Sequence, residues 1–106
     1  MRIVPIGLVN QRKIAKDIAA AAALLAPEVV RIRHNIGEDW SGDEAIFFRI
    51  VLSDPASRED TLRAVTTRIE NVLLKKVQPL ERWGLLSYFS FRSQSEQAEM
   101  KEEAWA

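Results

Sequence analysis

The sequence is poor in the residues that most small catalytic or secreted proteins rely on. Among its 106 residues there are no cysteines, one histidine, four glycines and four prolines. Without cysteine, disulfides, thiol catalysis and cysteine-liganded zinc or iron–sulfur clusters are excluded. No stretch reaches 18 consecutive apolar residues, and the apolar start is broken by Pro5 and Gly7, unlike a signal peptide. We therefore expect a protein of a bacterial-type cytoplasm with no membrane partner.

The few glycines and the lone histidine also leave no recognisable catalytic motif. The glycines at positions 7, 37, 42 and 84 form neither a phosphate-binding loop nor a dinucleotide fingerprint. Ser41 lacks the strand–turn–helix context of a nucleophile elbow. These absences favour a protein that is not an enzyme and that needs no cofactor.

Neither positive nor negative charge is in excess. Fifteen Lys and Arg residues balance fifteen Asp and Glu residues, giving a formal net charge of zero. A polyanion could therefore be held only by a local basic patch. A chain of this length buries about two thirds of the surface that it exposes when unfolded, so it can form one core without a metal or a disulfide.

The hydrophobic pattern that is present changes period along the chain. It predicts five elements in the order helix, strand, strand, helix, strand, over residues 11–26, 28–36, 45–53, 58–76 and 85–92. Pro27 and Pro79 end the two helices, and Ser57 is the expected cap of the second helix. We expect one domain over residues 1–94, followed by a polar, helix-compatible tail over 95–106.

This order of elements predicts an α+β two-layer sandwich, αββαβ. Both helices should cover one face of a mainly antiparallel sheet of three or four strands. An apolar strand over residues 2–9 would make the order βαββαβ, which resembles the ferredoxin-like group of folds. That resemblance implies no particular function.

Alternation along the strands predicts the composition of the two sheet faces. The face toward the helices should carry Val30, Ile32, Ile46, Phe48, Ile50, Leu52, Leu85, Phe89 and Phe91. The opposite face should carry Arg31, Arg33, Phe47, Arg49, Val51, Leu86, Tyr88 and Arg92. Arginine binds carboxylates and phosphates with a planar fork and stacks on aromatic rings, so this face suits an acidic protein partner or RNA. An ordinary solvated face, with arginine stems covering the aromatic rings, is the alternative.

All three tryptophans fall in predicted loops or in the tail. Tryptophan is enriched at binding hot spots, so Trp105 is a candidate partner-binding residue with the arginine face. The tail with Met100 and Trp105 is expected to dock on a second chain or to fold back over the sheet. Alternatively, Trp40 and Trp83 close the two ends of the core.

The loop over residues 34–44 contains the only weak candidates for a metal site. His34, Asp39 and Asp43 could together offer ligands to Mg²⁺ or Mn²⁺. Alternation places His34 on the face of Ile32, however, which favours a histidine at the edge of the core. We therefore predict no metal site.

These observations favour a non-catalytic binding module that acts through a partner protein or through its own copies. Its size and surface suit an accessory subunit or an antitoxin-like neutralising protein. One alternative is an RNA-binding module that uses the same arginine and aromatic face. The other is a metal-dependent enzyme built on the 34–44 loop.

Overall fold

The computed structural model describes residues 10–106, so the predicted strand over residues 2–9 lies outside the described residues. The elements follow the predicted order, with additional short helices. They are α2 (Gln11–Leu25), β1 (Val29–Glu38), β2 (Glu44–Leu52), η1 (Pro55–Ser57), α3 (Leu62–Val77), α4 (Pro79–Trp83), β3 (Leu86–Ser93), α5 (Gln94–Met100) and η2 (Glu103–Trp105).

The strands form one sheet in the order β1-β2-β3. β1 and β2 are an antiparallel hairpin, whereas β2 and β3 are parallel and are connected through α3. The fold is thus the predicted α+β sandwich with a mixed sheet. Its likeness to the ferredoxin-like order is only approximate, because three strands are present in the described part of the chain and β3 lies parallel beside β2.

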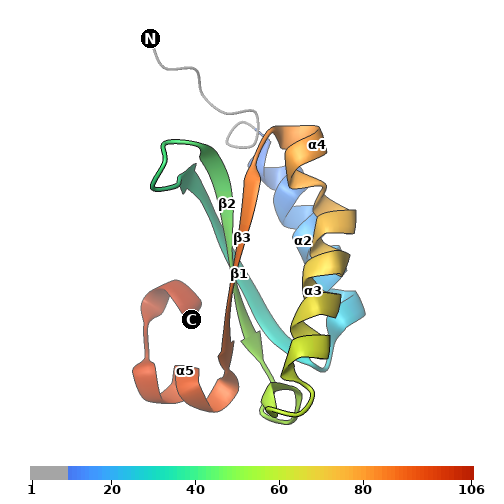
Figure 1. The fold of residues 1–106 in the computed structure, drawn as a ribbon, viewed down its shortest axis with the longest axis vertical. Helices are drawn as coiled ribbons and strands as arrows, with labels where there is room; N and C mark the ends of the chain where they lie inside the picture. The colour runs from blue at the N-terminus through green and yellow to red at the C-terminus, as the bar shows by residue number, and fades with distance from the viewer. Residues whose placement is uncertain (1–9) are drawn as a thin grey trace.

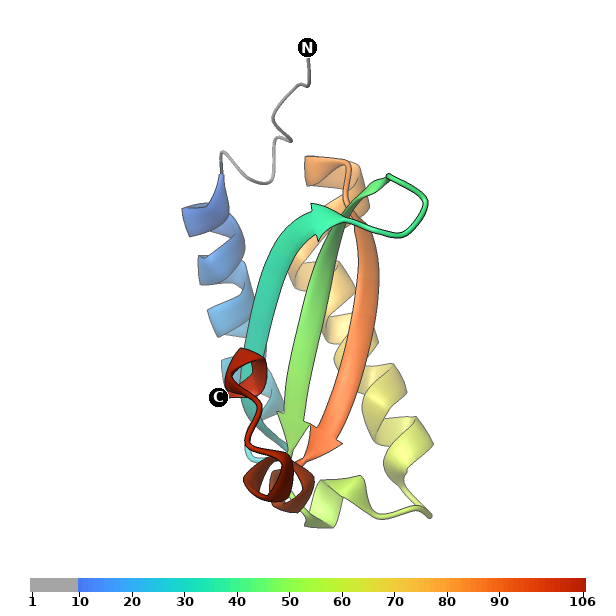
Figure 2. The same cartoon turned by 90° about the vertical axis from the view of Figure 1, so that its left-hand side faces the viewer.

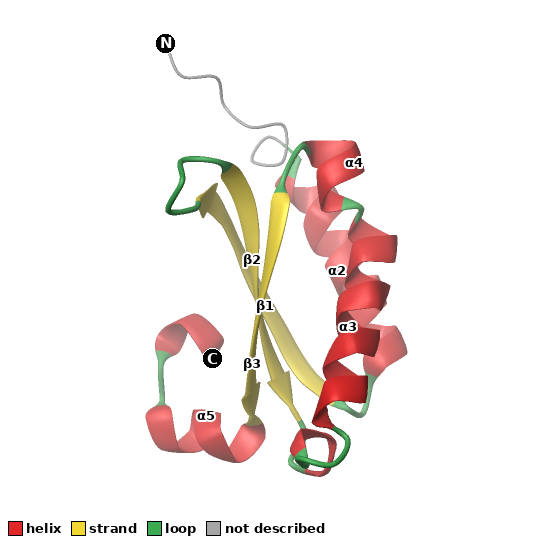
Figure 3. Cartoon of the chain, viewed as in Figure 1, coloured by secondary structure: helices red, strands yellow, loops and turns green. Residues whose placement is uncertain are grey.

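The two long helices, α2 and α3, lie on one side of the sheet (Figures 1 and 3). Their apolar stripes and the facing strand residues form the core, in which the rings of Phe48 and Phe89 stack with centroids 5.1 Å apart. Half-buried Trp83 packs against this core, whereas Trp40 does not close it. The core residues include Ile14, Ile18, Leu25, Val29, Ile46, Phe48, Ile50, Leu52, Ile69, Leu73, Val77 and Leu85.

The segments around α3 differ from the prediction at both ends. Pro55–Ser57 forms a 3-10 turn in which the Ser57 hydroxyl donates to the Ser53 carbonyl, so Ser57 does not cap α3 and the helix begins at Leu62. At the other end, Gln78 adopts a left-handed conformation (φ 50°) that ends α3. Pro79 then starts the short helix α4, because proline is compatible with the first position of a helix.

A bulge changes the start of β1. The register shifts between Val29 and Arg31, so Val29 faces the core and Val30 is 40% exposed. The prediction that Val30 faces the helices is therefore wrong, since an extra residue reverses the alternation locally. From Arg31 onward the predicted alternation holds.

The C-terminal segment, residues 94–106, crosses to the other side of the sheet. Helix α5 begins with a capping box in which Ser93 and Glu96 exchange hydrogen bonds. Ser95, in the first turn of α5, donates from its N–H and hydroxyl to Asp54, at 3.0 and 2.6 Å. The segment then lies in front of the lower part of the sheet (Figure 2).

Within residues 10–106, no helix is long and apolar enough to cross a bilayer.

Candidate functional site

The strand register brings the predicted arginines together on the sheet face that lacks α2 and α3. Arg31 and Arg92 flank Val51 on neighbouring strands, and Arg33 lies opposite Arg49. Phe47 lies opposite Tyr88 on the same face, nearer the loop that joins β1 and β2. The prediction that these side chains share one face is confirmed for all six.

The four arginines, Arg31, Arg33, Arg49 and Arg92, form an arginine cradle under the C-terminal segment. Three consecutive backbone oxygens of that segment accept hydrogen bonds from the Nε atoms of three arginines. The Arg49 Nε donates to Ala104 at 2.7 Å, the Arg31 Nε to Trp105 at 2.8 Å and the Arg33 Nε to Ala106 at 2.6 Å. Arg31, Arg33 and Arg49 therefore bind the backbone of the segment and not a particular side chain.

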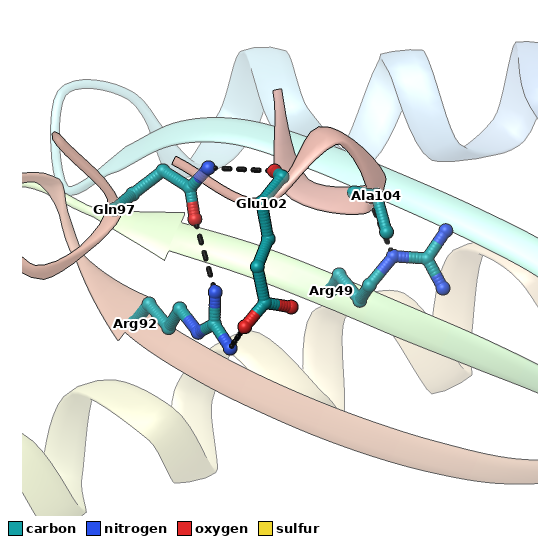
Figure 4. A network of polar contacts seen from close by, with 5 residues as sticks. All are labelled: Arg49, Arg92, Gln97, Glu102 and Ala104. Carbon is teal, nitrogen blue, oxygen red and sulfur yellow. Dashed lines mark hydrogen bonds and ion pairs between the residues drawn. The ribbon is translucent and has the colours of Figure 1, made fainter. Parts of the chain in front are cut away.

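The fourth arginine holds the side chains of the segment (Figure 4). The guanidinium of Arg92 lies 4.4 Å from the centre of the Trp105 ring, within cation–π distance. It also donates to Gln97 Oε1 at 3.2 Å and forms an ion pair with Glu102 at 2.9 Å. Buried Gln97 in turn donates to the Glu102 carbonyl at 2.9 Å, which closes the network.

Of the two arrangements predicted for the tail, the structure shows the one in which it folds back over the sheet. Trp105 is only 6% exposed, and Val51 on the same face is 1% exposed. The face opposite the helices is thus not open to solvent throughout, because the C-terminal segment of the same chain covers part of the cradle, while Arg33 stays exposed. Their role in binding a partner stays a prediction.

The pairing of Arg33 with Arg49 is unfavourable without acceptors. Like charges directly opposite each other destabilise an antiparallel pair. Here each Nε donates to the C-terminal segment, and Arg49 also donates from Nη1 to Asn35 Oδ1. A sheet that brings two arginines together in this way is suited to holding a polar, acceptor-rich ligand.

The upper part of the same face carries an aromatic patch made of Trp40, Phe47 and Tyr88. The rings of Phe47 and Tyr88 stack with centroids 5.4 Å apart, and the Trp40 ring lies 5.2 Å from that of Tyr88 at a tilt of 60°. Trp40 is 84% exposed, the most exposed of the large hydrophobic side chains in residues 10–106. Phe47 and Tyr88 are half-buried.

The loop that carries Trp40 is held by the Asp39 carboxylate. Asp39 Oδ1 accepts from the Ser41 N–H (2.9 Å), the Ser41 hydroxyl (2.7 Å) and the Asp43 N–H (3.0 Å). Asp39 Oδ2 accepts from the Tyr88 hydroxyl at 2.7 Å. These bonds, led by those from the Ser41 and Tyr88 hydroxyls, lower the pKa of Asp39 from 3.8 to about 2. Trp40 is therefore exposed on an ordered loop.

Replacing Tyr88 with phenylalanine is expected to raise the pKa of Asp39 toward its ordinary value. In the wild type the folded pKa lies below the unfolded one, so the stabilising contribution of Asp39 is present above about pH 4 and is lost as the pH falls toward 2. The variant removes one hydrogen bond to the charged form and keeps the ring. A carboxyl NMR titration of Asp39 should show a higher midpoint, whereas an unchanged midpoint would contradict the role of Tyr88.

The weak metal candidates do not converge. His34 lies opposite Phe48, on the face toward the helices, where burial and then the charge of Arg49 lower its pKa. Asp39 lies five residues further along, roughly 16 Å away for an extended strand, and bonds to Tyr88 on the other face. Residues 10–106 contain no group of three or more His, Asp or Glu side chains that could hold a metal ion.

Two organising residues, Gln97 and Glu102, were not predicted as site residues. Their contribution depends on the path by which the C-terminal segment returns to the sheet. The sequence of that segment has no hydrophobic periodicity that would predict this path. One local signal was available, since Ser93 and Glu96 have the spacing of a capping box and mark the start of α5.

Comparisons with protein-family models, with curated proteins and with solved structures give no match. The geometry of the arginine cradle and of the aromatic patch therefore carries the functional proposal.

Proposed function

We propose that this chain is a non-catalytic binding module that acts by engaging a partner protein through the aromatic patch. The observation that carries this proposal is the 84% exposure of Trp40 on an ordered loop. Leaving a large apolar ring in water is unfavourable, and buried tryptophans are among the side chains that contribute most to protein interfaces. Binding a partner would bury this ring without the cost of ordering its loop.

The neighbouring side chains support a protein as the partner. Phe47 and Tyr88 extend the apolar surface under Trp40, and both come from the rigid sheet. Two exposed charged residues lie near these rings: Asp43 follows Trp40 in its loop, and Arg33 pairs with Arg49, two residues from Phe47 on β2. An apolar centre with a polar rim is typical of protein interfaces. An accessory subunit or an antitoxin-like neutralising protein would act through such a contact.

Replacing Trp40 with alanine is expected to abolish capture of the partner. Tagged wild-type protein would be used to isolate complexes from the source organism, with nuclease treatment, and bound proteins would be identified by mass spectrometry. We expect one protein at near-equal amounts with the wild type and at least a tenfold smaller amount with Trp40→Ala, since hot-spot truncation costs about 2 kcal/mol or more.

The matched control is Leu24→Ala on α2, which removes a 61% exposed apolar side chain from the helix layer. This variant should capture the partner as well as the wild type does. Equal capture by wild type and Trp40→Ala would contradict the proposal.

The alternative RNA-binding function stays a prediction and has a distinct signature. Its arginines would have to leave the hydrogen bonds that they make with the C-terminal segment. RNA binding should weaken linearly with log salt, with a slope of about −0.7 per phosphate contact, whereas an interface centred on Trp40 should change little with salt.

A further inference from the structure

We propose that the arginine cradle is a peptide-binding site, and that its external ligand is an acidic, tryptophan-bearing segment of the partner protein, which replaces residues 102–106. This inference rests on the proposed function and extends it by naming the chemistry of the partner. The C-terminal segment is then a built-in occupant that shows how such a peptide binds.

The hydrogen bonds from Arg31, Arg33 and Arg49 are independent of the sequence of the occupant. Three Nε atoms bind the backbone oxygens of Ala104, Trp105 and Ala106. Any peptide that follows the same path offers the same acceptors. The cradle can therefore accept a second chain without losing these bonds.

Selectivity comes from two side-chain contacts around Arg92. Its guanidinium lies over the Trp105 ring and pairs with the Glu102 carboxylate. Tryptophan is the best aromatic partner for a cation, and arginine–carboxylate bonds are stronger than neutral ones. Four arginines on one small area favour an acidic ligand, so the matching segment carries a tryptophan preceded by an acidic residue.

The C-terminal segment is separate from the core that holds the fold together. No residue of α5 or η2 belongs to the core cluster, and the segment with its buried Trp105 lies on the side of the sheet opposite α2 and α3 (Figure 1). Within the described residues, the segment is held by the bonds that the arginines donate to it, by the buried Trp105 ring beside Arg92, and by the bonds that Ser95 donates to Asp54. Its release would expose the cradle and leave the two-layer sandwich intact.

The cradle and the aromatic patch are close enough to bind one partner segment together. Phe47 of the patch and Val51, which lies between Arg31 and Arg92 of the cradle, are four residues apart on β2, about 13 Å along the strand. A partner chain of eight to ten residues, on the order of 30 Å when extended, spans both. Contact with Trp40 would then favour the partner over the tethered segment.

The test uses full-length Trp105→Ala, whose own segment lacks the anchoring ring. The probe is a labelled, amidated peptide with the sequence of residues 94–106. Fluorescence anisotropy should show that it binds Trp105→Ala, and that it binds wild type roughly ten- to a hundredfold more weakly, because the tethered segment competes at a millimolar effective concentration. The same peptide with its tryptophan replaced by alanine should not bind, and Arg92→Ala added to Trp105→Ala should remove binding.

A folded Trp105→Ala, judged by circular dichroism, that does not bind the peptide overturns the inference. It leaves the proposed function intact if Trp40-dependent capture persists. If Trp105→Ala does not fold, excess unlabelled peptide is added to wild type, where displacement should shift the indole N–H resonance of Trp105 and an unmoved resonance overturns the inference. Two further results would overturn the inference. One is a mixed dimer of wild type and Trp105→Ala that the peptide cannot dissociate. The other is binding of a mixed-sequence RNA without binding of the peptide.

Discussion

Replacing Trp105 with alanine is expected to release residues 94–106 from the sheet while the helix-side core stays folded. Truncating a buried tryptophan costs about 3–5 kcal/mol when the surroundings cannot adjust. Here the loss is limited by the free energy that docks the segment, because the segment can detach as a unit. Hydrogen exchange should show lost protection in residues 94–106 and retained protection in α3 and β2.

The control for this release is Trp40→Ala, which removes an equally large ring that is already exposed. It should leave the exchange pattern of the C-terminal segment unchanged. If Trp105→Ala instead lowered protection in α3 and β2 as much as in the segment, the segment would be part of the cooperative fold. The cradle could then not be vacated without unfolding the protein.

The two faces of the sheet could be predicted from the sequence because alternation is a local property of extended chain. Arg31 and Arg33 are two residues apart on β1, and Arg33 pairs with Arg49 on β2. Arg92 pairs with Val51, two residues beyond Arg49, so all four arginines share a face. The exception at Val30 arises from a bulge. Its position depends on how the hairpin pairs, which the periodicity does not encode.

That the tail folds back over the sheet is one of the two arrangements predicted for it, but its position on the arginines could not be predicted, for a different physical reason. Three of its contacts use backbone oxygens, which every residue has, so the sequence carries no sign of them. The bond from Tyr88 to Asp39 likewise joins residues 49 positions apart. The residue type of Trp105 alone predicts a docking residue, but the surface on which it lies required the structure.

The largest loss of stability is expected for Phe48→Ala, on the helix-facing side of β2. Phe48 is 1% exposed and stacks on Phe89, so the variant loses apolar burial and leaves a cavity. We expect a loss of about 3–5 kcal/mol. The free energy of unfolding of domains of this size is only about 5–15 kcal/mol, so this loss is a large part of it. Urea unfolding should show a lower midpoint with an unchanged slope.

Phe47→Ala is the matched control, because it removes the same side chain from the next residue of the same strand. Phe47 points to the opposite face, is half-buried and stacks on the Tyr88 ring, so the expected loss is about 1 kcal/mol. Its effect should appear in partner capture, which should fall as it does for Trp40→Ala. If the two faces have separate roles, Phe48 acts in stability and Phe47 in binding. Equal destabilisation by the two substitutions would therefore mean that the aromatic patch serves the fold and not a partner.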